Sequence, residues 1–270
     1  NIKVKILLHQ KGRLREYLDN NLIKYDLINR ECYNEKKTRI KNMLTIISFI
    51  IFGIKFLYNN KKSIIHFNEF RVSFTWIIPL LFFNNVIIIH ARSLFFKSTI
   101  LNIICDRANQ IISISKFVQK SFPIKYNRKI IKINNPVIST TCYNKNKFIS
   151  NFNLNKNLKT ICYISNFKPM KRPLLYLDIA FKLQKLRSDV QFLMFGNFNK
   201  SYEQKIKDKI NDLKLKSKLQ YFSFQKDINS IISNSDIVVL PGVNEPAGRI
   251  ALECFINKTL VIASNSGGYK

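Results

Sequence analysis

The chain has 270 residues and 46% hydrophobic content, enough for a folded core, which excludes a low-complexity or disordered chain. Its formal net charge is +29, and residues 1–150 are the more basic part, with 26 basic and 7 acidic side chains. The charge is mostly scattered lysine without a helix-turn-helix, zinc-ligand or RNA-recognition pattern, so we expect no nucleic acid partner. Diffuse positive charge suits an anionic membrane surface better, and we keep that surface as a candidate partner.

Five cysteines occur without a Cys-x-x-Cys pair, and only three histidines are present. This pattern predicts neither a disulfide framework nor a zinc site. Small buried thiols in a reducing compartment are the expected state.

Short apolar runs alternate with helix-like stretches through the first half of the chain. The alternation predicts an α/β domain over residues 1–150. Pro79 is expected to break a helix, and Ser115 to cap one. The chain begins with Asn in a strand pattern, so we expect a fragment without a signal peptide. The expected strands are 2–8, 63–67, 86–90, 110–114 and 129–133, and the expected helices are 12–20, 42–58, 71–83, 93–107 and 115–121.

The most apolar run of the chain is Met43 to Tyr58. Its 16 residues fall short of the roughly 20 that a membrane-spanning helix needs. We therefore expect a buried or interfacial helix, with membrane contact as the alternative.

The second half opens with a polar, Asn-rich stretch, 138–157, that has no hydrophobic period and is expected to be a linker. Five strands and four helices then alternate, which predicts a Rossmann-like domain over residues 151–270. Because the chain stops in a loop after Gly268, we expect this domain to be incomplete. The expected strands are 159–164, 190–195, 219–224, 237–240 and 260–263, and the helices are 173–187, 201–214, 227–234 and 246–257.

Two carboxylates, Glu245 and Glu253, stand eight positions apart where the fourth of these strands passes into a helix. Pro246 suits the first helical turn, and a spacing of about two turns places both carboxylates on one face. Strand, glycine loop and helix together present helix-N-terminal amides to an anion. Such a pair alone is common on solvated helices, but this setting favours a ligand with both hydroxyls and phosphates, namely a nucleotide sugar.

A basic cluster follows the first strand of the same domain. Lys168, Lys171 and Arg172 lie where parallel strands end, at the edge of the sheet where ligands bind. Cationic side chains at this place suit a diphosphate and its leaving charge. A solvated loop in a lysine-rich chain is the competing interpretation.

Residues 235–253 resemble the strand, loop and E-x7-E helix of the retaining family 4 glycosyltransferases, which have the GT-B fold. Residues 259–268 resemble the strand and Gly-Gly turn that follow in that family. Residues 164–171 resemble its phosphate loop, usually Gly-Arg-x4-Lys. Lys171 is in place, but Ser165 and Asn166 stand where Gly and Arg are usual. Asn166 is kept as a candidate donor-binding residue, and Arg172 or Lys168 is expected to substitute at the phosphate.

The resemblance implies two Rossmann-like doubly wound domains with an interdomain cleft, an acceptor-binding one over 1–150 and a donor-binding one over 151–270. Glu245 would contact donor-sugar hydroxyls or stabilise positive charge at the anomeric centre, and Glu253 would bind the ribose. Lys171 would neutralise the diphosphate. The amides of Ala247, Gly248 and Arg249 would hold the sugar and the diphosphate.

The first half resembles the family more weakly. The stretch 64–68, with His66 and Asn68, resembles its His-x-Asn strand end. The stretch 89–93 resembles a His-x-Arg-Glu motif, with Ser93 in place of the acid. Either His90 or Arg92 would then face the reacting sugar, although a histidine at a strand end often serves the structure alone.

The resemblance implies a retaining hexosyltransferase that moves a sugar from a nucleotide-diphosphate donor to a glycan or lipid-linked acceptor. No Asp-x-Asp motif occurs, so neither a metal nor another cofactor is expected. The implied setting is surface polysaccharide or lipopolysaccharide synthesis, in the cytoplasm or peripherally on the inner face of its membrane. The alternatives are a non-enzymatic basic protein that binds nucleic acid or anionic membrane, and an epimerase or phosphorylase.

Overall fold

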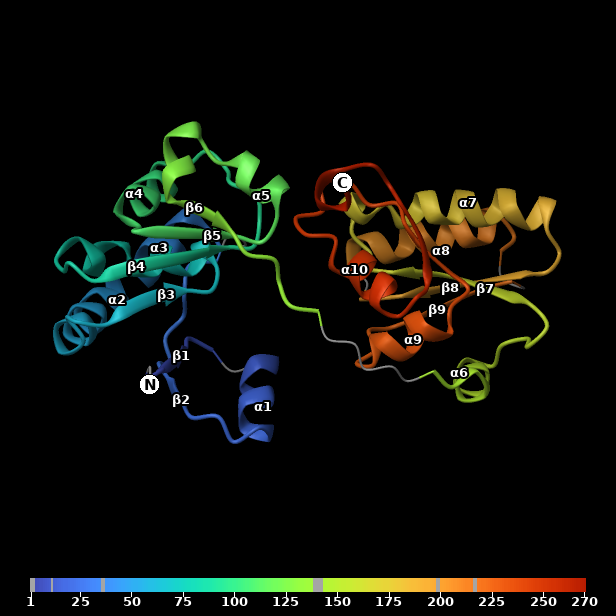
Figure 1. Cartoon of the computed structure of the whole chain (residues 1–270), viewed down its shortest axis with the longest axis horizontal. Helices are drawn as coiled ribbons and strands as arrows, with labels where there is room; N and C mark the ends of the chain where they lie inside the picture. The colour runs from blue at the N-terminus through green and yellow to red at the C-terminus, as the bar shows by residue number, and fades with distance from the viewer. Residues whose placement is uncertain (1–2, 11, 35–36, 138–142, 198–199, 216–217) are drawn as a thin grey trace. The chain divides into compact units, whose positions relative to one another are not determined.

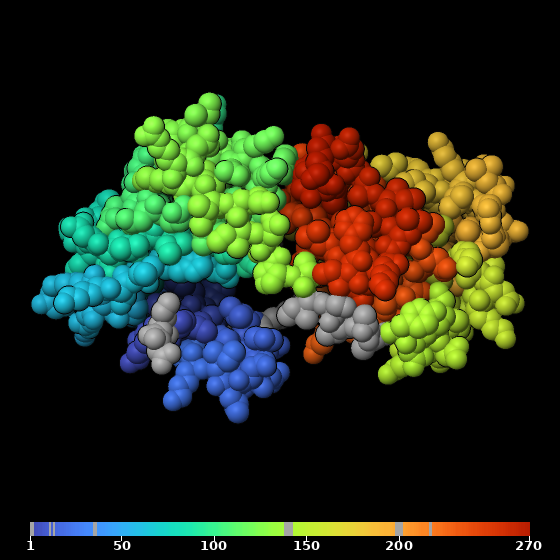
Figure 2. Space-filling view, viewed as in Figure 1, coloured from blue at the N-terminus to red at the C-terminus, as the bar shows by residue number. Residues whose placement is uncertain are grey.

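The computed structural model describes residues 3–10, 12–34, 37–137, 143–197, 200–215 and 218–270. The chain divides into two compact units, Asn1–Ile133 and Asn134–Lys270 (Figure 1), and Figure 2 shows one face of the molecule in space-filling form with the same colours. The division falls before the predicted boundary at residue 150. Part of the predicted linker is the helix α6 (Lys145–Phe152), whose buried Phe148 packs into the second unit. Cys142, also in that stretch, lies outside the described residues.

The first unit contains a parallel four-stranded sheet whose strands lie side by side in chain order, from β3 to β6. The strands are β3 (Ile64–Phe67), β4 (Val86–Ala91), β5 (Gln110–Ser113) and β6 (Ile130–Lys132). The helices are α2 (Arg39–Asn59), α3 (Phe70–Leu81), α4 (Thr99–Arg107), α5 (Lys116–Ser121) and the 3-10 turn η1 (Ile124–Lys129).

The first segment of the chain forms a separate two-stranded parallel sheet. It consists of β1 (Ile6–Leu8), α1 (Arg13–Asn20) and β2 (Tyr25–Leu27). The sequence did not predict β2. His9, just after β1, joins this segment to the core, because its ring stacks on Phe49 and accepts a hydrogen bond from Trp76 Nε1.

Two helix predictions in the first unit were wrong in detail. Residues 93–98 are irregular, and α4 begins only after Ser98, whose side chain caps the amide of Leu101. Pro79 lies inside α3 rather than breaking it, because it occupies the last helical turn and its ring packs on Gly53 of α2. Ser115 caps α5 as predicted, accepting from the amide of Val118 at 3.0 Å.

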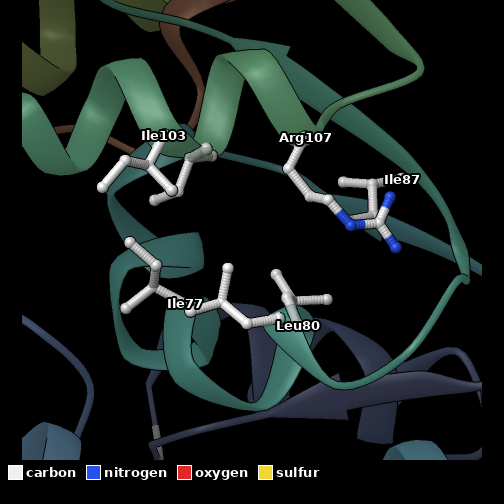
Figure 3. A pocket seen from close by; sticks show the side chains of 7 residues that line it. Ile77, Leu80, Ile87, Ile103 and Arg107 are labelled. Carbon is white, nitrogen blue, oxygen red and sulfur yellow. The ribbon is translucent and has the colours of Figure 1, made fainter.

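A small apolar gap separates α3 from α4 (Figure 3). Ile77 and Leu80 point into it from one helix and Ile103 from the other. The Arg107 guanidinium at its rim donates to the carbonyls of Phe83 and Asn85. The gap measures about 10 Å³, close to the minimum for one water, so it is a packing imperfection and not a ligand site.

The second unit is a doubly wound parallel sheet with strand order β11-β10-β7-β8-β9. All five predicted strands are present. The three inner strands are mostly buried, and each of the two outer strands pairs with one of them. β8 and β9 lie on one side of β7, whereas β10 and β11 lie on its other side, so the strand order reverses between β7 and β10. The strands are β7 (Lys159–Ile164), β8 (Val190–Phe195), β9 (Leu219–Phe222), β10 (Ile237–Leu240) and β11 (Leu260–Ala263).

Alternate residues of these strands enter two cores, one on each face of the sheet. Tyr163 and Phe192 pack beneath α7 (Pro173–Leu186) and α8 (Lys200–Asp212). Cys162 and Leu193 pack on the other face against α6, α9 (Ile228–Asn234) and α10 (Arg249–Ile256). Figure 1 shows these helices on opposite sides of the sheet.

The cysteines that the structure describes are free thiols, as the sequence predicts. Cys105, Cys162 and Cys254 are buried, and Cys32 is half-buried. Burial raises the pKa of Cys162 to about 12, so this thiol stays protonated and acts as a small apolar side chain.

Candidate active site

The main site candidate lies where the strand order of the second unit reverses. β7 and β10 are adjacent, parallel strands, so the loops after them emerge at the same edge of the sheet. Lys171 stands in the loop after β7, and Glu245 in the loop after β10. The edge beyond a strand-order reversal is the usual ligand position in open α/β sheets.

Lys171 and Glu245 form an ion pair across these two loops. Their side chains are only 20% and 17% exposed, so water screens the pair incompletely. Tyr163 fixes the backbone beside it, because its hydroxyl donates to the Lys171 carbonyl at 3.1 Å. The sequence predicts a diphosphate as the partner of Lys171; in the structure its ammonium contacts the carboxylate predicted to face the sugar.

The turn Gly267–Gly268 holds the Glu245 loop by backbone contact. The Gly268 amide donates to the Glu245 carbonyl at 2.6 Å, and Ser266 Oγ accepts from the Asn244 amide at 3.2 Å. Gly267 has φ +65°, and a Cβ there would lie 2.6 Å from the Glu245 nitrogen. A Cβ on Gly268 would lie 2.8 Å from the Pro246 oxygen. Both positions therefore need glycine.

Helix α10 begins later than the sequence predicts. Its first residue is Arg249, and Gly248 precedes it with a left-handed φ of +63°. Pro246 therefore lies in the loop, because the chain must turn at Gly248 before it can enter the helix. The first amides of the helix, Arg249 and Ile250, have no acceptor within it and suit an anion.

Glu253 lies on the second turn of α10 and is only 7% exposed. Arg249 Nε donates to its Oε1 at 2.7 Å, whereas the Arg249 side chain itself is 68% exposed. The pair fixes one oxygen of the buried carboxylate and places a cation beside it. Glu253 thus lies on α10 and Glu245 in the loop before it, so the predicted two-turn spacing on one helical face does not relate them. Each of the two carboxylates is paired with a cation.

The loop between β7 and α7 carries the other predicted phosphate ligands. The side chains of Asn166, Lys168 and Arg172 are exposed. Its backbone is fixed closely to the sheet, since a Cβ on Gly196 would lie 1.8 Å from the Ser165 oxygen. A binding role for these three side chains stays a prediction.

The first unit gathers polar residues at the ends of β3 and β4. The rings of His66 and His90 stack with centroids 5.9 Å apart, and Arg92 donates to Asn68 Oδ1 at 3.3 Å. His90 Nε2 is enclosed and has no hydrogen-bond partner among the residues that the structure describes. Burial, then the charge of Arg92, lowers the pKa of His90, which favours the neutral imidazole.

Glu69 joins this group, although it belongs to none of the motifs recognised in the sequence. It is half-buried, and Ser93 Oγ donates to its Oε1 at 3.2 Å. Burial raises the pKa of its carboxyl group, opposed by Arg71 and by the Ser93 hydrogen bond. The pairing of Phe67 with Ile89 places the ends of β3 and β4 side by side. Knowledge of this register would have been needed to predict that Glu69 lies beside Ser93.

No group of three or more His, Cys, Asp or Glu side chains with metal-binding geometry occurs within the described ranges.

Residues 144–270 match the family model described as "Glycosyl transferases group 1". A search of curated protein sequences gave no match. Among solved structures, Anabaena Alr3699/HepE in complex with UDP is similar at 17% identity and a TM-score of 0.77, covering 98% of this chain and 74% of that chain. A glycosyltransferase from Rickettsia africae ESF-5 is 21% identical, with a TM-score of 0.77 and coverages of 98% and 71%.

WaaG, titled a glycosyltransferase involved in lipopolysaccharide biosynthesis, is similar at 12% identity and a TM-score of 0.64. The alignment covers 91% of this chain and 70% of WaaG. At these identities the likeness shows the fold. The second unit carries the family match, and the whole chain carries the structural one. Residues 144–270, just under half of the chain, thus resemble the glycosyl transferases group 1 family, and the whole chain has the GT-B glycosyltransferase fold.

Proposed function

We propose that this protein is a retaining glycosyltransferase that moves a sugar from a nucleoside-diphosphate donor to a glycan or lipid-linked acceptor. The observation that carries the proposal is the placement of Glu245. It stands at the strand-order reversal, paired with Lys171 and bonded to the Gly267–Gly268 turn, beside a helix N-terminus. The UDP complex of Anabaena Alr3699/HepE, which has the same fold, supports a donor of this class.

Donor binding would exchange the partner of Lys171. A diphosphate carries more charge than a carboxylate and would attract the ammonium, assisted by the α10 amides. Glu245 would then be released to accept hydrogen bonds from the sugar hydroxyls. As the bond from the anomeric carbon to the diphosphate breaks, Glu245 would stabilise the positive charge left on the sugar, and Lys171 the negative charge on the leaving group.

Glu253 would bind the ribose hydroxyls through the oxygen that Arg249 leaves open. In the first unit, His90 and Arg92 would act on the acceptor side, near the reacting sugar. We propose metal independence because lysine, arginine and helix amides would supply the positive charge, and retention because of the E-x7-E resemblance. Surface polysaccharide or lipopolysaccharide synthesis at the cytoplasmic face of a membrane is the proposed setting.

A thermal-shift panel of nucleoside diphosphates and nucleotide sugars, with and without EDTA, tests the donor assignment. One nucleoside diphosphate is expected to raise Tm, its sugar conjugate to raise it further, and EDTA to change neither. Glu253→Gln should reduce the shift, whereas Glu203→Gln on α8 should not. Strongly salt-dependent binding to nucleic acid with no nucleotide shift would instead support the basic binding protein.

Retention has a separate measurement. The matched donor should be hydrolysed slowly, and proton NMR of the first sugar released would give its anomeric configuration. Release of the opposite anomer from that of the donor would contradict retention without touching the donor assignment.

A further inference from the structure

Helix α2 in the first unit has two apolar faces. One face packs into the unit, with Phe49, Gly53 and Leu57 buried against neighbours that include Pro79 of α3. The opposite face is exposed and apolar as well. Its members recur at spacings of three, four or seven residues and so form one stripe along the helix. We call it the outer stripe, and its residues, each between 52% and 82% exposed, are Ile40, Met43, Leu44, Ile47, Ile51 and Tyr58.

Helix α2 is longer than the predicted 42–58, since it spans 21 residues, and its added first turn brings Ile40 into the outer stripe. By length and composition alone, α2 is able to cross a membrane. Its inner face argues against crossing, since Phe49 and Leu57 are fully buried in the unit. A spanning orientation would expose the core on that side, whereas a helix lying along a surface keeps it intact.

The charged side chains on α2 and just beyond its two ends are all of one sign, and one of them, Lys37, forms an ion pair with Glu31. Residues 37–62 contain six basic side chains and no acidic one. Lys41 and Lys55 lie at the margin of the stripe, and Lys61 and Lys62 follow the helix end, all of them exposed. An apolar ridge flanked only by cations matches an anionic lipid surface, with acyl chains for the ridge and headgroups for the ammonium groups.

We propose that the outer stripe of α2 docks this protein on an anionic lipid bilayer, with the helix axis parallel to the membrane plane. The inference does not rest on sugar transfer. It assigns individual residues and an orientation to a membrane contact that the sequence suggested only through overall charge and through the apolar run Met43–Tyr58. A second copy of the chain fits the stripe less well. A two-fold contact would place one set of cations against the identical set.

Flotation with vesicles of phosphatidylcholine and phosphatidylglycerol tests the proposal, with pure phosphatidylcholine vesicles beside them. We expect the chain to float with the anionic vesicles and not with the neutral ones, and to dissociate as salt rises. Ile47→Glu together with Ile51→Glu should reduce binding at least about tenfold by removing apolar burial. Each of Lys41→Gln and Lys55→Gln should reduce it about fivefold at low salt.

Ile124→Glu is the matched control. Ile124 is 85% exposed in the same unit but lies in η1, away from the outer stripe. The same change of residue there adds a negative charge without removing apolar burial, so it should reduce flotation only slightly. The only tryptophan, Trp76, is buried beside Phe49, and its unchanged emission would show that each variant is folded.

Three results would overturn the proposal. The first is equal binding of the wild-type chain to neutral and anionic vesicles. The second is equal loss of binding in Ile124→Glu and in the stripe variant. The third is a dimer in light scattering that Ile51→Glu dissociates while vesicle binding persists, which would assign the stripe to a second copy.

Discussion

The two units both place polar side chains where parallel strands end, but they hold them by different means. In the second unit, close backbone contacts fix the loops that carry the ion-paired Lys171 and Glu245. The Gly267–Gly268 turn lies against the Glu245 loop, and Gly196 lies against Ser165. In the first unit, His90, Arg92 and Glu69 each contact another side chain, and the Glu69 carboxyl group also has hydrogen bonds with the backbone of Phe70 and Arg71. A site fixed by backbone contact resists rotamer changes but is sensitive to any added Cβ, whereas a side-chain cluster is sensitive to charge and pH.

The largest effect is expected at Glu245. Glu245→Gln keeps the shape but removes the charge that faces Lys171 and, in the proposed reaction, the sugar. We expect kcat to fall roughly 100- to 1000-fold, as for the loss of one preorganised electrostatic group. Initial rates of donor turnover would measure it, with Glu203→Gln as the control. A rate that falls by less than about threefold, far less than the loss of such a group causes, would show that Glu245 takes no part in the proposed chemistry.

Gly267→Ala tests whether backbone contact holds the site. The added Cβ would meet the Glu245 nitrogen at a left-handed φ, so we expect a loss of about 2–4 kcal/mol in the free energy of unfolding of the second unit. Hydrogen exchange of that unit would measure the loss, because the single tryptophan lies in the first unit. Gly12→Ala, where a Cβ meets no atom within 4 Å, is the control. Equal stabilities of the two variants would break the comparison.

His90→Gln tests the side-chain cluster of the first unit. We expect kcat to fall about tenfold, less than at Glu245, because this cluster supports the reaction by position and protonation state. The fall should be smaller in His66→Gln, since His66 is the more exposed ring of the stacked pair. Rates that do not change in either variant would confine the chemistry to the second unit.

The pH dependence of His90 has a defined sign. Burial lowers its folded-state pKa below 6.5, so the unfolded chain binds the proton more readily. The free energy of unfolding should therefore fall as pH drops from 6.5 to the folded-state pKa, and then level off. The acid limb of kcat/KM should likewise lie below pH 6.5. A shift of that limb in His90→Gln, and not in His66→Gln, would assign it to His90.

The smallest effect is expected at the amino ends of the strands of the second sheet, where Asp236 precedes β10. Asp236 accepts from the Thr160 amide at 2.8 Å and contacts Lys145 and Lys159. Burial opposes ionisation, but the Thr160 bond and the two lysines outweigh it and lower the carboxyl pKa. Its stabilisation is thus present above pH 3.8 and lost as pH falls through the folded-state value. Asp236→Asn should cost about 1–2 kcal/mol at neutral pH in denaturant unfolding, and Asp208→Asn much less.

Sequence alone predicted the sheet of the second unit well, since runs such as Val190–Phe195 are apolar at all positions but one, Gln191, and are buried throughout. It missed α6, because the three apolar residues of this helix, Phe148, Ile149 and Phe152, stand within a long Asn-rich stretch; in the structure they pack against the second unit. It missed β2 because three residues are too few for a pattern to show.

The residues of the candidate site were predictable one by one, but their pairing was not. Lys171 and Glu245 are 74 positions apart in the chain, and only the placement of β10 beside β7 brings them into contact. Glu69 meets Ser93 for the same reason, through the register of β3 and β4. A motif fixes which side chains are available, and the strand order decides which of them meet.

Strand β11 gives the Glu245 loop an unexpected dependence. It is one of the two edge strands of its sheet, with Leu260 61% and Ile262 55% exposed, so it is held mainly by its ladder to β10. The turn that follows it supplies the amide bonded to Glu245. Local opening of this edge would therefore release the Glu245 loop together with β11 as one cooperative segment. The central strands can stay folded while this carboxylate is lost from position, so the lifetime of the ordered site is set by one of the least buried strands of the sheet.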